Sequence, residues 1–240
     1  MLMHLSAQNL RIWQTCRRQF QYCFIEELGL PISSKQQKSQ ELGRQFHLLV
    51  QQLRLGLPVK QITDLAPELK KWLEQYQQYP PPLILGMEYV EHQRSIKFGS
   101  YMLTGIYDLL ILGQNQAQIV DWKTHQIASS YEQLKTDWQT CLYLYLLKST
   151  TDYLPTQISM TYWFANAEPA HKSVTIRYDD QWHWQIHKQL LEITTTLTQQ
   201  LLPLPALTPE SQPCQKCEFN YRCHGEQLLP DIEAIPEVAI

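Results

Sequence analysis

Two acidic residues stand in apolar runs of the chain where uncharged side chains would be expected. The stretch LTGIYDLLILGQNQAQIVDWKT, residues 103 to 124, carries Asp108 before the turn-like GQNQ and Asp121 after it. If the two runs pair as an antiparallel hairpin, Leu112 faces Ala117 and Asp108 lies opposite Asp121. Like charges at that separation repel each other, and a cation between them removes the conflict.

Lys123 completes a group that could perform phosphoryl chemistry. Strand side chains alternate, so Lys123 should share a face with Asp121 while Trp122 points the other way. Carboxylate oxygens hold Mg²⁺ or Mn²⁺, the metal polarises a phosphate and acidifies water, and a lysine orients the nucleophile or stabilises developing charge. This group predicts metal-assisted phosphodiester hydrolysis in a cleft with apolar walls, formed by Ile106, Leu110 and Ile119. The structural alternative is an ion pair between Asp108 and Lys123, with Asp121 beginning a turn.

The composition indicates one globular domain of ordinary size, or a domain with an appendage. The chain has 240 residues, 44% of them hydrophobic, and a net charge of -3, which argues against bulk electrostatic binding of nucleic acid. Residues 1 to 60 nevertheless carry +5, which leaves -8 for the rest. No apolar run approaches the length of a membrane span, and the N-terminal residues lack the order of a signal peptide, so we expect a soluble, cytoplasmic protein.

Hydrophobic periodicity predicts helices around a mixed sheet of about four or five strands, an α/β core. The expected helices cover residues 6–28, 41–57, 66–78, 130–149 and 181–202, and residues 33–40 read as a polar loop. The expected strands cover residues 83–93, 95–112, 117–124, 158–166 and 173–179. A proline-rich linker at 203–213 leads into a cysteine-bearing tail.

The motifs GIYD and IVDWKT resemble motifs II and III of the PD-(D/E)xK nuclease superfamily, in its RecB-like branch. The resemblance implies a restriction-endonuclease-like core, with Asp108 and Asp121 as metal ligands and catalytic residues and Lys123 as a catalytic residue. Tyr107 stands where the superfamily name has proline. A single nuclease domain over residues 1–240 is implied, with a helical N-terminal region at 1–82, a core at 83–200 and a tail at 201–240.

Two helical motifs extend the resemblance. ELGRQFHLL is similar to the G-x-x-x-H motif of the branch, in which Gly43 would let the helix approach the sheet and His47 would reach the metal. A histidine ligand shifts the metal preference toward Mn²⁺. QTCLY matches the Q-x-x-x-Y motif, in which Gln139 and Tyr143 support the catalytic site and contact DNA. Each motif by itself is also compatible with an ordinary packed helix.

The cysteines complete the resemblance. Cys214, Cys217 and Cys223 follow C-x2-C-x5-C, and Cys16 lies near the other end of the chain, in a segment similar to the family's C-P-x-x-F site, although Arg17 replaces the proline. The family arrangement implies a [4Fe-4S] cluster that joins the tail to the N-terminal helix. Zinc remains an alternative, supported by His224. Two further cysteines are left over: Cys23, which has no assignment, and Cys141, read as a buried small residue.

Together these features predict a stand-alone DNA exonuclease that resembles the small CRISPR-associated RecB-like exonucleases. It would act on single-stranded DNA or DNA ends in CRISPR adaptation, with an integrase as a possible partner, or in recombination and repair. The basic N-terminal region would bind DNA, with contributions from Arg11, Arg17, Arg18 and Arg44. Glu88 could be an additional carboxylate or an exposed strand residue. The alternatives are a non-catalytic DNA-binding scaffold and a zinc-stabilised binding module. No phosphate-binding loop of a fused helicase occurs.

Overall fold

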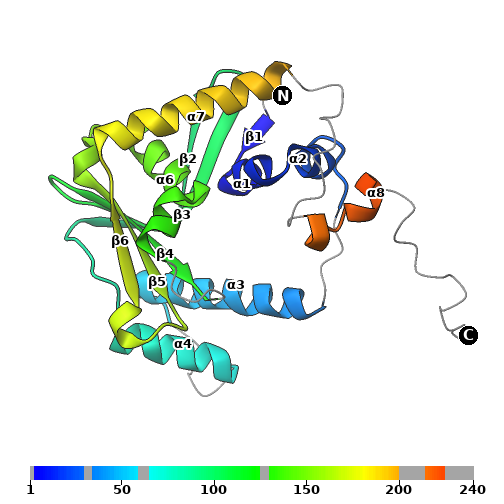
Figure 1. The fold of residues 1–240 in the computed structure, drawn as a ribbon. Coiled ribbons are helices and arrows are strands. Elements are labelled where there is room, and N and C mark those ends of the chain that lie inside the picture. Colours follow the sequence, from blue (N-terminus) through cyan, green and yellow to red (C-terminus); the bar gives the residue numbers. More distant parts are fainter. Residues whose placement is uncertain (1–2, 30–33, 59–64, 125–129, 200–213, 225–240) are drawn as a thin grey trace, which may run out of the picture. The chain divides into compact units, whose positions relative to one another are not determined.

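The computed structural model describes residues 3–29, 34–58, 65–124, 130–199 and 214–224 (Figure 1). Their contacts form two compact units. The first comprises residues 1–11 and 32–199, and the second comprises residues 12–31 and 200–240. The predicted linker at 203–213 lies outside the described residues. Within the described part of the chain, no helix is both long enough and apolar enough to cross a membrane.

A mixed sheet is the centre of the first unit, as the α/β pattern predicted, but it has six strands rather than four or five, because the short β1 near the N-terminus was not predicted. Its strand order is β1-β3-β4-β5-β6, and β2 pairs with the other edge of β3. Parallel pairing joins β1 to β3 and β4 to β5, and the remaining pairs are antiparallel. The strands are β1 (Met3–Leu5), β2 (Met87–Phe98), β3 (Tyr101–Leu112), β4 (Ala117–Lys123), β5 (Ile158–Phe164) and β6 (Ser173–Arg177).

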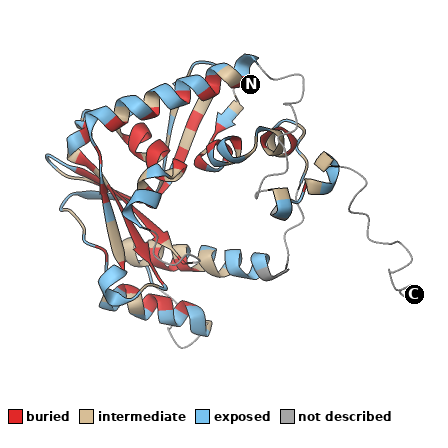
Figure 2. Cartoon of the chain, in the orientation of Figure 1, coloured by how far each residue is buried: buried red, intermediate tan, exposed pale blue. Residues whose placement is uncertain are grey.

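Helices cover both faces of this sheet. One face packs against α3 (Ser34–Arg54) and α4 (Pro67–Gln78) in an aromatic cluster in which Phe46 stacks on Trp163, with ring centroids 5.7 Å apart. The other face packs against α6 (Trp138–Ser149), which is preceded by α5 (Tyr131–Thr136) and contacts α7 (Asp180–Gln199). Burial is concentrated in the strands between these layers (Figure 2).

Three boundaries predicted from periodicity were wrong, each because a local signal was missed. The strand predicted at 95–112 is two strands, since Gly99 adopts a φ of 59° and turns the chain between β2 and β3. The helix predicted at 130–149 breaks at Asp137, whose side chain caps α6. The polar segment predicted as a loop at 33–40 belongs to α3 from Ser34 onward, because its lysines and glutamines are good helix formers.

The N-terminal helix predicted at 6–28 is also two helices, α1 (Ala7–Thr15) and α2 (Arg17–Phe24). Cys16 separates them with an extended backbone, and its sulfur accepts a hydrogen bond from the Gln19 amide. In the second unit, the ring of Tyr22 on α2 packs against Phe219, with centroids 5.0 Å apart. Phe219 directly precedes the short helix α8 (Asn220–His224).

Candidate nuclease centre

The β3–β4 hairpin has the register predicted from its turn. Leu112 pairs with Ala117, and the ladder continues as far as Leu109 and Val120. One further step would place Asp108 opposite Asp121, but the backbone ladder stops there. The Asp108 side chain forms the next link between the strands, because its Oδ2 accepts a hydrogen bond of 2.8 Å from the backbone amide of Trp122.

The neighbouring β2–β3 ladder is interrupted at the same level. Val90 pairs with Leu109 and His92 pairs with Tyr107, while the intervening Glu91 and Asp108 form no backbone pair. Glu91 has a φ of 50°, which is unusual for a residue with a side chain. The irregular backbone therefore brings two carboxylates together at one point of the sheet.

Side-chain alternation along β3 changes at Asp108. The Tyr107 hydroxyl donates to the Tyr143 carbonyl on α6, whereas Leu109 packs in the cluster beneath α3 and α4. A regular strand would place both side chains on one face. Of the three predicted apolar wall residues, Leu110 and Ile119 are fully buried, whereas Ile106 is 47% exposed and lines a hollow together with Gln139.

Three side chains meet as a candidate metal site at this interruption. His47, Glu91 and Asp108 each offer one ligand atom, and these atoms lie within 4.8 Å of one another. His47 Nδ1 is 3.3 Å from Asp108 Oδ1, and His47 Nε2 is 3.1 Å from the Trp122 carbonyl oxygen. Since a carbonyl only accepts, Nε2 carries a proton and Nδ1 is the atom that can bind a metal. A histidine ligand held by a backbone carbonyl is a common arrangement in metal sites.

Burial disfavours the protonated form of His47, but the hydrogen bond to Asp108 and the charges of the nearby acids outweigh this effect. Together they raise the pKa of His47 to about 9. The pKa of Glu91 is also raised, first by burial and then by repulsion from Asp108. A divalent cation would replace the proton and relieve the repulsion between the carboxylates, so these donors fit a hard or borderline metal ion.

Asp121, Lys123 and Gln139 form a second group beside the first. Asp121 Oδ2 lies 2.8 Å from Lys123 Nζ, and Gln139 Nε2 donates to Asp121 Oδ1 over 2.6 Å. Lys123 Nζ in turn donates to Gln139 Oε1 over 2.7 Å. Asp121 and Lys123 therefore share a face, as predicted, and the lysine pairs with Asp121 rather than with Asp108.

Burial raises the pKa of Asp121, against the opposing effect of Lys123. Its Oδ2 is enclosed and accepts no well-aligned hydrogen bond from the described residues, although the lysine ammonium is near. A buried carboxylate oxygen with unused acceptor capacity is another feature that suits a cation.

The two residues of the Q-x-x-x-Y motif have different surroundings. The Gln139 side chain reaches Asp121 and Lys123, and its backbone N–H donates to Oδ1 of the capping Asp137 over 2.7 Å. The Tyr143 ring packs against Tyr107, with centroids 5.1 Å apart, and lies over Gly105, where an added Cβ would come within 2.9 Å of it. Gln139 therefore touches the charged group directly, while Tyr143 supports the strand beneath it.

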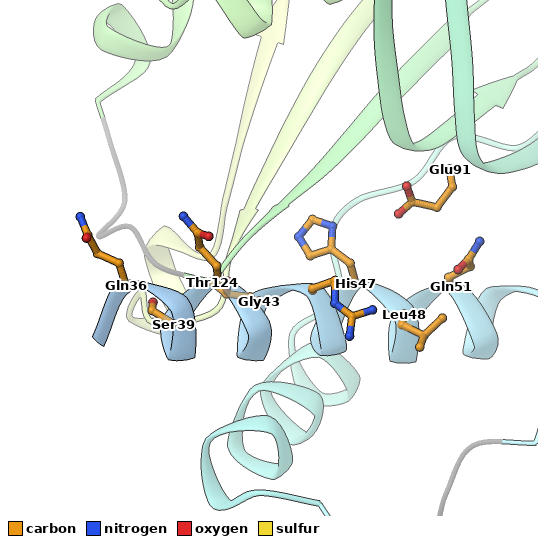
Figure 3. Close-up of a pocket in the computed structure, with 10 residues that line it drawn as sticks. Gln36, Ser39, Gly43, His47, Leu48, Gln51, Glu91 and Thr124 are labelled. Carbon is orange, nitrogen blue, oxygen red and sulfur yellow. The ribbon is translucent and has the colours of Figure 1, made fainter. Parts of the chain in front are cut away.

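The G-x-x-x-H motif sets the distance between α3 and β4. A Cβ on Gly43 would lie 3.0 Å from the Thr124 hydroxyl at the end of β4, so the glycine permits the close approach. Gly43, His47, Glu91 and Thr124 line one hollow of about 740 Å³. Figure 3 shows His47 and Glu91 pointing toward each other from α3 and β2 at this hollow.

Glu88 of β2, which the sequence analysis named as a possible additional carboxylate, does not reach the candidate metal site. It forms an ion pair with Arg54 of α3. Glu91, three residues later, is the carboxylate that reaches His47 and Asp108, and the sequence analysis did not identify it. The motif MEYVEH shows two acids on one strand, but only the left-handed backbone at Glu91 decides which of them turns to the site.

The sequence pattern of the PD-(D/E)XK nuclease superfamily matches residues 59–224. The chain belongs to this superfamily. Membership implies hydrolysis of phosphodiester bonds with divalent metal ions. No curated protein matches the sequence.

Matches to this superfamily member among solved structures include the following two. The "putative exonuclease" from Eubacterium rectale is 10% identical with a TM-score of 0.50, and the match covers 90% of this chain and 94% of that one. SSO0001 is 14% identical with a TM-score of 0.44, and the match covers 92% of this chain and 85% of that one.

Four cysteines of the nuclease meet in its second unit. Cys16, Cys214, Cys217 and Cys223 line one small hollow of about 20 Å³, together with His224. Burial raises the pKa values of Cys217 and Cys223, and repulsion from neighbouring thiols contributes. Such thiols retain their protons until a metal or cluster binds, so the donor set fits a thiolate-ligated group.

The other two cysteines differ. Cys141 is buried on α6, as predicted, where burial raises its pKa to about 12 and makes the thiol unreactive. Cys23 on α2 lies outside the lining of the hollow, although the charge of Cys217 contributes to its raised pKa, after burial.

Proposed function

We propose that the chain is a metal-dependent DNA exonuclease that acts on single strands. The observation that carries the proposal is the meeting of His47, Glu91 and Asp108 next to the Asp121–Lys123 pair. Three candidate ligands beside a lysine held by Gln139 form a site for hydrolytic attack on a phosphate.

Each residue has a definite role in this proposal. His47, Asp108 and Asp121 would hold Mg²⁺ or Mn²⁺, with Glu91 as a further ligand, and the bound metal would supply positive charge to the phosphate and acidity to the attacking water. Lys123, oriented by Asp121 and Gln139, faces the developing negative charge. Tyr143 keeps β3 in place through its contact with Tyr107.

The basic N-terminal residues named for DNA binding have partners within the chain. Arg11 pairs with Asp137 at 2.7 Å, Arg44 pairs with Glu41 at 2.7 Å, and Arg17 lies over the Trp13 ring. Exposed pairs of this kind are weak, so a DNA phosphate can replace the carboxylate. We infer that Arg11 contacts the DNA backbone and that Arg17 and Arg18 are further candidates for this role, whereas Arg44 stays bonded to Glu41 through two of its nitrogens.

A [4Fe-4S] cluster on Cys16, Cys214, Cys217 and Cys223 is the second part of the proposal. Zinc sites usually combine paired short spacings, whereas these cysteines comprise one remote residue, Cys16, and a C-x5-C interval between Cys217 and Cys223. This pattern supports a polynuclear cluster over zinc. The cluster would tie the tail to the start of α2, which supports a structural role.

The test of the nuclease proposal uses end-labelled single-stranded and double-stranded DNA with Mg²⁺, Mn²⁺ or EDTA. We expect metal-dependent shortening of the single strand from its end, and its loss in Asp121→Ala with an unchanged melting temperature and cluster spectrum. Full activity of Asp121→Ala would refute the assignment. Binding of DNA without any cleavage would instead favour a scaffold in recombination or CRISPR adaptation, the pathways that the motif resemblance suggests.

The test of the cluster is spectroscopic. Protein purified without oxygen should be brown, with about four iron atoms per chain, and Cys217→Ser should lose both colour and iron. Colourless protein that contains one zinc per chain would refute the cluster.

A further inference from the structure

The hollow at the candidate metal site extends well beyond its ligands, along one side of α3. Besides His47 and Glu91, its lining includes Gln36, Gln40 and Gln51 of this helix. Figure 3 shows Gln36 and Gln51 toward opposite ends of the labelled stretch of α3, with His47 between them. The fifteen helical steps from Gln36 to Gln51 correspond to ~22 Å, or roughly six nucleotides at the rise of ~3.4 Å per nucleotide of one strand.

Away from the metal ligands, most of the described side chains that line the hollow are uncharged. They include three amides, the hydroxyl of Ser39 and the apolar Leu48. Arg44, the arginine among the described lining residues, is bonded to Glu41 through both its Nε and Nη2 atoms. Such a surface attracts phosphate weakly, whereas amide groups both donate and accept hydrogen bonds and therefore suit the edges of bases and sugars.

We propose that this hollow holds the bases and sugars of the single strand that adjoins the phosphate being cleaved. The inference rests on the proposed function, because the hollow is continuous with His47 and Glu91. Its volume of about 740 Å³ is in the range of pockets for small ligands, so it can take up base and sugar groups of an unpaired strand that runs along α3. The glutamines, rather than arginines, then determine how many nucleotides the nuclease engages.

The sequence of α3 offers a matched pair of variants. Gln40 is exposed and Gln51 is half-buried, and both line the hollow. Gln37 is likewise exposed and Gln52 half-buried on the same helix, but neither belongs to the lining. Each double variant removes two side-chain amides from α3. Gln40→Ala/Gln51→Ala removes them from the lining of the hollow, and Gln37→Ala/Gln52→Ala removes them from outside it, while alanine preserves the helix.

The experiment measures binding of fluorescein-labelled single strands of 2 to 12 nucleotides in Ca²⁺, by anisotropy, with the full chain. For wild type, Kd should fall with length up to roughly six nucleotides and then level off. Gln40→Ala/Gln51→Ala should weaken binding of the longer strands about tenfold, the loss expected from two neutral hydrogen bonds. The slope of log Kd against log salt should stay the same, because no phosphate contact is removed. The Gln37→Ala/Gln52→Ala protein should bind like wild type.

Equal behaviour of the two double variants, or an equal effect on the shortest strand, would overturn the inference. A changed salt slope would also overturn it, because it would indicate phosphate contacts. Hydrolysis of bis(p-nitrophenyl) phosphate in Mn²⁺ is measured separately and should be unaffected in the control variant Gln37→Ala/Gln52→Ala. Its absence in wild type would count against the proposed catalytic centre, while the binding series would still decide whether the hollow holds a strand.

Discussion

Glu91 stands level with Asp108 across the β2–β3 ladder, at the one step between Val90 and His92 where backbone pairing is missing. At this step Glu91 has a left-handed backbone, and the Asp108 side chain accepts a hydrogen bond from the Trp122 amide instead of a backbone pair forming. Together with His47, the two carboxylates form a group that no regular ladder would assemble. The interruption of the strand is thus part of the candidate centre.

Glu91→Gln should weaken Mn²⁺ binding at least tenfold, because it removes one of the proposed ligands while preserving the shape of the side chain. Calorimetric titration of the metal measures this, and nuclease activity should recover at high metal concentration. Glu88→Gln is the control on the same strand, since Glu88 pairs with Arg54 instead. An equal loss in both variants would contradict the assignment of Glu91.

Gln139→Ala should lower kcat roughly ten- to hundredfold, the usual effect of removing a group that orients ligands or catalytic side chains. The loss follows because Gln139 is bonded to both Asp121 and Lys123. KM for DNA should change little, and steady-state kinetics separate the two constants. A change confined to KM would show that Gln139 only binds substrate.

Metal binding should become tighter as pH rises from about 6.5 toward 9. In the metal-free protein the pKa of His47 is raised to about 9, so the metal must displace a proton over this range. The apparent Kd for Mn²⁺ should fall by up to tenfold per pH unit, with proton release detected by titration in buffers of different ionisation enthalpy. His47→Gln should bind Mn²⁺ more weakly and with a shallower dependence on pH.

The metal-free protein should also lose stability over the same pH range. A histidine whose pKa is raised on folding stabilises the protein fully below its unfolded pKa, near 6.5, and this contribution is lost as pH rises through about 9. Relative to His47→Gln, the free energy of unfolding of wild type should fall by about 2 to 3 kcal/mol between these limits. Urea unfolding in EDTA at several pH values tests this difference, and parallel curves would contradict it.

Gly43→Val should destabilise the protein by roughly 1 to 3 kcal/mol, because even a Cβ would lie 3.0 Å from the buried Thr124 hydroxyl. Adding Thr124→Ala should recover part of the loss, which a double-mutant cycle of urea unfolding measures. Purely additive effects would show that the two residues do not meet.

Local patterns predicted the hairpin and its register, and with them the shared face of Asp121 and Lys123, because turn length and a two-residue period act between neighbours in sequence. Spacing of one helical turn likewise predicted that Gly43 and His47 lie on one side of α3. Periodicity did not reveal the breaks at Cys16, Gly99 and Asp137, since a single cap or a positive φ interrupts an element without altering the apolar pattern around it.

The sequence by itself thus determined the α/β class, the hairpin and the identities of most charged residues at the centre. Tertiary structure alone decided that Glu91 rather than Glu88 joins them, that Trp122 fixes His47 through its carbonyl, and that Gln139 bridges Asp121 and Lys123. These relationships join residues far apart in the chain, and they depend on an irregular strand and on the packing of α3 and α6 against opposite faces of the sheet. No pattern within a single segment carries that information.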